Sequence, residues 1–66
     1  MDWTHIAIDW TRFRHAAKRR WDRLGEEQLV AIRGRRHLLA KRITEVYVIS
    51  GEDAERQLAE WQAELA

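Results

Sequence analysis

The stretch FRHAAKRRWDRL, residues 13–24, decides the fold, because it places two aromatic residues and a leucine among basic side chains. Its apolar residues, counted from the tryptophan just upstream, follow at spacings of three and four: Trp10, Phe13, Ala17, Trp21 and Leu24. Side chains at these spacings lie on one face of an α-helix. The stretch therefore predicts an amphipathic helix over residues 9–24 with a basic outer face. We expect Asp9 as its N-cap and Gly25 as a left-handed residue after its end.

A second periodic run follows Gly25 and is interrupted by Gly34. Its face positions keep the same spacing: Leu29, Ile32, Arg36, Leu39, Ile43 and Val46. Glycine inside a helix costs about 1 kcal/mol relative to alanine, and one long helix would leave much of its apolar face uncovered. Two helices, over residues 26–33 and 35–47, are therefore favoured over one continuous helix. At the other end of the chain, residues 1–8 are expected to form a lead-in segment whose Trp3 folds back onto the core.

The last helix has the clearest start signal. Ser50 is expected as the N-cap and Asp53 stands at the capping-box position, so the helix is predicted over residues 51–65. The chain contains no proline and shows hardly any strand-like alternation. Residues 1–66 are therefore expected to form a single all-α domain of three to four helices.

Tryptophan supplies the core of this short chain. There is no cysteine for a disulfide or a thiolate metal site, but there are four tryptophans among 66 residues. Each would bury on the order of 150–250 Å². The predicted core residues are Trp10, Phe13, Trp21, Leu24, Leu29, Ile32, Leu39, Ile43, Leu58 and Trp61.

The charge is divided unevenly along the chain, although its net value is only +1. Residues 1–43 carry 11 Lys or Arg against 5 Asp or Glu, whereas residues 44–66 carry 1 against 6. Two explanations are open: the halves neutralise each other within the fold, or the basic half binds an anionic partner such as nucleic acid. The candidate anion contacts are Arg12, Arg14, Lys18, Arg19, Arg23, Arg33 and Arg35.

A solvated helix face is favoured over a nucleic-acid site. Trp21, which would have to stack on bases, lies on the apolar stripe and is needed for the core. An anionic membrane is a third alternative for the first helix, but its apolar face would have to leave the core to reach lipid. No apolar run approaches the length that spans a bilayer, so no membrane insertion is expected.

Patterns for catalysis and metal binding are not found. Ser50 is the only serine and is assigned to a helix cap, and the three histidines are not spaced as paired ligands. We therefore predict no catalytic residue, no metal site and no cofactor, and we do not expect an enzyme. The N-terminal residues lack a signal-peptide pattern. A cytoplasmic monomer with an unknown partner, protein or nucleic acid, is the expectation.

The order of residues from Met1 to about Trp61 follows the pattern of a known protein family. The matching residues are Trp3, Ile6, Trp10, Phe13, Trp21, Leu24, Leu29, Ile32, Gly34, Arg36, Leu39, Ile43, Tyr47, then Ile49, Ser50, Ala54, Glu55, Gln57, Glu60 and Trp61. This pattern resembles the CsbD-like family of small bacterial stress-response proteins. The resemblance implies two short helical hairpins packed crosswise and expression in a general stress response, and it implies no reaction.

The chain departs from the family pattern in two ways. Glycine is common in the family at positions where this chain has Ile8, His15, Asp22 and Val48. Acidic residues are common where it has Arg19 and Arg33, so its first half is unusually basic. The sequence thus predicts a non-enzymatic, stress-associated protein that acts by binding or protecting other molecules. The alternative is a non-specific nucleic-acid binder that uses the basic first half.

Overall fold

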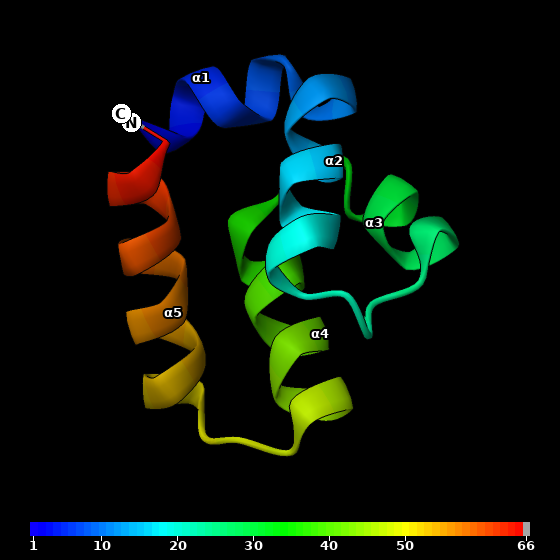
Figure 1. Ribbon diagram of the computed structural model, residues 1–66, viewed down its shortest axis with the longest axis vertical. Helices are drawn as coiled ribbons and strands as arrows, with labels where there is room; N and C mark the ends of the chain where they lie inside the picture. The colour runs from blue at the N-terminus through cyan, green and yellow to red at the C-terminus, as the bar shows by residue number, and fades with distance from the viewer. Residues whose placement is uncertain (66) are drawn as a thin grey trace.

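The computed structural model describes residues 1–65, and over this range the all-α prediction is confirmed. The helices are α1 (Trp3–Ile8), α2 (Trp10–Arg20), α3 (Glu26–Ile32), α4 (Arg36–Tyr47) and α5 (Gly51–Glu64). The helices α4 and α5 run antiparallel, and α1 lies across one end of the molecule (Figure 1). The Met1 ammonium group donates a hydrogen bond to the Gln62 carbonyl (2.7 Å), so the N-terminus is held against the last turns of α5. Residue 66 of the predicted domain lies outside the described residues.

Residues 3–8 form α1 in place of the expected lead-in segment. The Asp2 side chain caps this helix by accepting a hydrogen bond from the Thr4 N–H (3.4 Å). A helix of six residues is too short to be stable alone in water. Burial stabilises it here: Ile6 is fully buried, and Trp3 packs against the core.

The helix α2 ends at Arg20, short of the predicted end at residue 24. Trp21 leaves the helical conformation (φ −125°, ψ 74°), and both Trp21 and Leu24 are buried in the core from the turn that follows. Gly25 is not left-handed as expected. It is the extended N-cap of α3 (φ −73°, ψ 150°), and its N–H donates a hydrogen bond to Gln28 Oε1 (2.9 Å).

The chain between α3 and α4 turns through two left-handed residues, Arg33 (φ 54°) and Gly34 (φ 78°). Gly34 is buried, and a Cβ atom built on it would lie 2.9 Å from Cα of Ala7. The backbone of α1 therefore packs directly on this glycine. Trp3 Nε1 donates a hydrogen bond to the Gly34 carbonyl (2.8 Å), which ties α1 to the same turn.

The helix α4 stops at Tyr47 although no glycine follows it. Val48 adopts the left-handed conformation instead (φ 53°, ψ 54°) and is 86% exposed. The next residues define the turn, because Ile49 packs against the core and Ser50 is the N-cap of α5. Ser50 Oγ accepts a hydrogen bond from the Asp53 N–H (3.1 Å), as an N-cap does.

One core joins the helices. Every side chain predicted for it is buried: Trp10, Phe13, Trp21, Leu24, Leu29, Ile32, Leu39, Ile43, Leu58 and Trp61. Ile6, Ala17 and Ala54 complete the buried cluster. Among the described residues, no polar or charged residue is buried.

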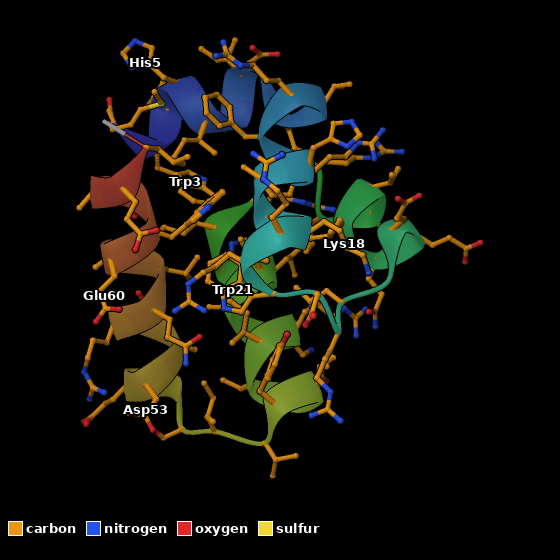
Figure 2. The ribbon with its side chains drawn as sticks, viewed as in Figure 1. Trp3, His5, Lys18, Trp21, Asp53 and Glu60 are labelled. Carbon is orange, nitrogen blue, oxygen red and sulfur yellow. The ribbon has the colours of Figure 1, made fainter. Side chains whose placement is uncertain are left out.

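The indole rings pack in or against the core, and the N–H groups of Trp3, Trp10 and Trp21 donate hydrogen bonds there. Trp10 Nε1 donates to the Leu29 carbonyl (2.7 Å), and Trp21 Nε1 donates to Gln57 Oε1 (2.8 Å). The rings of Trp21 and Trp61 meet edge to face with centroids 5.3 Å apart. Figure 2 shows Trp3 and Trp21 directed into the space between the helices. The tryptophans therefore serve packing and are not presented for stacking on a ligand.

Candidate binding surface

The basic side chains of α2 stand outside its buried face, which consists of Trp10, Phe13 and Ala17. Their surroundings differ greatly, and they separate into those held by the protein's own groups and those left free. A guanidinium or ammonium group already hydrogen-bonded to main-chain carbonyls has fewer donors for a ligand. The partners of each predicted contact therefore decide which residues remain candidates.

Lys18 is held by the turn that follows α2. Its Nζ donates to the carbonyls of Asp22 (2.8 Å) and Leu24 (2.6 Å). These contacts satisfy main-chain acceptors in the segment where the helix ends early. Lys18 is thus a structural residue of this turn, with little left to offer an anion.

Arg35 closes the end of α3. Its Nε donates to the Ile32 carbonyl (3.1 Å) and its Nη2 to the Ala31 carbonyl (3.1 Å). The last carbonyls of a helix lack partners within it and carry partial negative charge, so a cation is favourable there. Arg35 stabilises the junction between α3 and α4.

Three arginines lie against rings. Arg12 approaches the Phe13 ring (5.4 Å) and stands 4.0 Å from the Asp9 carboxylate, an exposed pair that contributes little. The Arg23 guanidinium lies 5.9 Å from the centre of the Tyr47 ring, and the main-chain N–H of Arg23 donates to the Tyr47 hydroxyl (3.1 Å).

The third of these arginines, Arg20, lies 5.3 Å from the Trp21 ring. It was not among the predicted contacts. Its only signal in the sequence is its place beside that tryptophan.

Arg14, Arg19 and Arg33 form no ion pair with any residue in the described range 1–65. Arg14 and Arg33 line one groove of about 310 Å³, at the corner where α1 ends, α2 begins and α3 packs against α2. The groove is completed by Ile8, Trp10, Thr11 and Val30. We call it the Arg14–Arg33 groove. Arg19 lies elsewhere, in a shallow depression beside Glu64.

The acidic second half hardly neutralises the basic first half. Of the ion pairs in the described chain, Arg36–Glu55 and Arg42–Glu45 join residues 1–43 to residues 44–66, and of these two only Arg36–Glu55 links residues distant in the sequence. Arg36, the charge on the apolar stripe, also donates to Gln62 Oε1 (3.2 Å). The other pairs are local, at i, i+3: Asp9–Arg12, Arg42–Glu45 and Asp53–Arg56. Figure 2 shows Glu60 on the far side of α5 from Lys18.

Another groove, of about 550 Å³, lies between α4 and α5 and carries mixed polar groups. Thr44 Oγ1 donates to the Lys41 carbonyl (2.6 Å), and Glu55 pairs with Arg36, so both groups are already engaged by the protein itself. Within residues 1–65, no three His, Asp or Glu side chains lie close enough together to hold a metal ion. This groove therefore offers no ordered set of groups for acid–base or metal chemistry.

None of the helices over residues 1–65 combines the length and apolar character needed to cross a bilayer.

Comparison with known proteins identifies bacterial relatives. The chain is 35% identical to a UPF0337 protein of Pectobacterium atrosepticum over 54 residues, which are 82% of this chain and 78% of that protein. It is 28% identical to the UPF0337 protein YjbJ of Escherichia coli and of Salmonella typhimurium over the same share of this chain and 78% and 77% of theirs. No family model matches the chain, and no solved structure matches it significantly. At this identity and coverage, the chain belongs to the UPF0337 family.

Proposed function

We propose that this protein is a non-enzymatic, cytoplasmic protein of the bacterial stress response that acts by binding or protecting other molecules. The CsbD-like resemblance supports the link to stress. The observation that supports the non-enzymatic part is the use of the interior, which apolar side chains, four of them aromatic, fill. Binding is then left to the surface, where a small protein presents charged side chains to a partner.

The stress link predicts a change in abundance and in survival. We expect the protein to accumulate when its source bacterium meets a general stress such as nutrient exhaustion, heat or high osmolarity. A strain without the gene should survive that stress less well and recover when the gene is restored. Quantitative immunoblotting and colony counts measure both effects. Unchanged abundance and unchanged survival under all these stresses would contradict the proposal.

Nucleic acid is the second candidate partner, and one observation favours it: Arg14, Arg19 and Arg33 are not neutralised by the acidic half. Contacts between arginines and phosphates release counterions, so binding weakens as salt rises. Such binding would be independent of base sequence, because contacts between guanidinium groups and phosphates carry no sequence information.

Titration with duplex DNA tests this candidate. We expect amide shifts localised near Arg14, Arg19 and Arg33 at low salt. Each phosphate contact contributes about −0.9 to the slope of log K against log salt, so the Arg14→Gln/Arg33→Gln variant should reduce that slope by about 1.8. Arg56→Gln, which alters an arginine paired with Asp53, is the control and should bind like wild type. Absence of shifts at low salt would eliminate nucleic acid as the partner.

A further inference from the structure

The Arg14–Arg33 groove exposes aliphatic surface that the fold does not need. Ile8 is 80% exposed and Val30 is 51% exposed, and both line this groove. The remaining exposed large hydrophobic residues of the described chain, Met1 and Val48, do not line it. Two aliphatic side chains on one corner of a small protein are therefore available to contact something apolar.

The charge beside these side chains is positive. Arg14 and Arg33 are the only charged residues that line this groove, and neither has an ion-pair partner in residues 1–65. The carboxylates of Glu26 and Glu27 line the adjoining depression on the α3 side. Arg14, Val30 and Arg33 line that depression as well. Ile8 and Val30 thus stand beside two guanidinium groups that form no ion pair, with Glu26 and Glu27 on the α3 side of them.

This combination matches the surface of an anionic bilayer. Guanidinium groups pair with lipid phosphates, and neighbouring aliphatic side chains reach the apolar layer beneath the headgroups. A nucleic-acid backbone would use the arginines but would give Ile8 and Val30 nothing apolar to contact. Such a contact also leaves the core intact, because neither Ile8 nor Val30 belongs to the buried cluster.

We infer that the Arg14–Arg33 groove is a peripheral docking site for anionic phospholipid membranes, through Ile8 and Val30 together with Arg14 and Arg33. This site goes beyond the proposed stress-associated role and does not depend on it. Two arginines and two aliphatic side chains give weak, reversible attachment, comparable to a single membrane-binding signal.

Sedimentation with vesicles tests the inference. Wild-type protein should sediment with phosphatidylglycerol vesicles and remain in solution with phosphatidylcholine vesicles. The Arg14→Gln/Arg33→Gln variant should partition onto these vesicles about 30-fold less than wild type. Each basic residue near an anionic surface contributes about 1 kcal/mol to binding, and this variant removes two of them. Ile8→Ser should lose about tenfold.

Matched controls separate this site from a general charge effect. Arg42→Gln/Arg56→Gln removes the same charge from residues outside the groove, and Val48→Ser removes an exposed aliphatic side chain elsewhere. Both should partition like wild type.

Equal losses in groove and control variants, or no sedimentation of wild type with phosphatidylglycerol, would overturn the inference. If the protein binds DNA but not vesicles, and Ile8→Ser leaves the DNA binding unchanged, the groove is a nucleic-acid site instead. Self-association that Ile8→Ser abolishes, again without vesicle binding, would assign it to a second copy.

Discussion

The Trp21→Ala variant is expected to be largely unfolded at room temperature. Trp21 is 1% exposed, and its ring meets that of Trp61 edge to face. Truncating a buried tryptophan to alanine costs about 3–5 kcal/mol, because apolar contacts are lost and a cavity remains. The change also leaves Gln57 Oε1 without its indole donor.

The whole stability of the chain is of the same size as this loss. At roughly 0.05–0.15 kcal/mol per residue, 66 residues give about 3–10 kcal/mol. Urea titration followed by far-UV circular dichroism measures the effect. Trp21→Phe is the matched control: it keeps an aromatic ring, removes the hydrogen bond to Gln57, and should cost about 1–2 kcal/mol. A Trp21→Ala protein with the wild-type urea midpoint would show that Trp21 does not support the core.

Gly34→Ala is expected to lower stability by about 2–5 kcal/mol. A residue with a Cβ atom costs about 1–2 kcal/mol in the left-handed conformation that Gly34 adopts. The new Cβ would also lie 2.9 Å from Cα and 3.0 Å from the carbonyl oxygen of Ala7, and overpacking of this kind adds about 1–3 kcal/mol. Because these Ala7 atoms are backbone, relief requires α1 to move away from the turn. The hydrogen bond from Trp3 to Gly34 should weaken with that movement.

Two other positions provide controls of opposite sign. A Cβ on Gly51 would meet nothing within 4 Å, and this residue begins α5, so Gly51→Ala should raise stability by up to about 1 kcal/mol. Val48→Gly removes left-handed strain from an exposed residue, but glycine also gives the unfolded chain more conformational freedom. The net effect should be an increase of about 0.5–1 kcal/mol in the free energy of unfolding. Thermal unfolding measures all three variants. A Gly34→Ala protein that melts with Gly51→Ala would show that α1 does not pack on this glycine.

Predictions from the sequence succeeded where the signal was local. The apolar spacing located the side chains that fill the core, and Ser50 marked the start of α5. The predictions failed at α1. A helix of six residues is not stable in isolation, and its formation depends on tertiary contacts that the sequence does not show. The predictions also placed the end of α2 too late, because Trp21 and Leu24 continue the apolar spacing after the backbone has left the helix.

The candidate binding residues were predicted by charge and could not be ranked by it. Lys18 and Arg35 stand in the sequence like any other basic residue, yet both are bound to main-chain carbonyls at helix ends. Arg14 and Arg33 are far apart in the chain and share a groove only because α3 packs beside α2. The exposure of Ile8 could not be predicted, because residues 1–8 were expected to form a lead-in segment and the sequence alone does not show which of its side chains contact the core.

The sequence by itself determined the helical class, the residues of the core and the uneven charge, since each depends on side-chain type and on spacing within one helix. Only the tertiary structure decided which arginines remain free, why position 34 must be glycine and which aliphatic side chains stay in water. These depend on how segments distant in the chain are placed, as in the packing of Ala7 on Gly34 and the position of Ile8 and Val30 around one groove. The physical reason is that helix periodicity depends on residues close together in the sequence, whereas packing and charge neutralisation depend on contacts between separate helices.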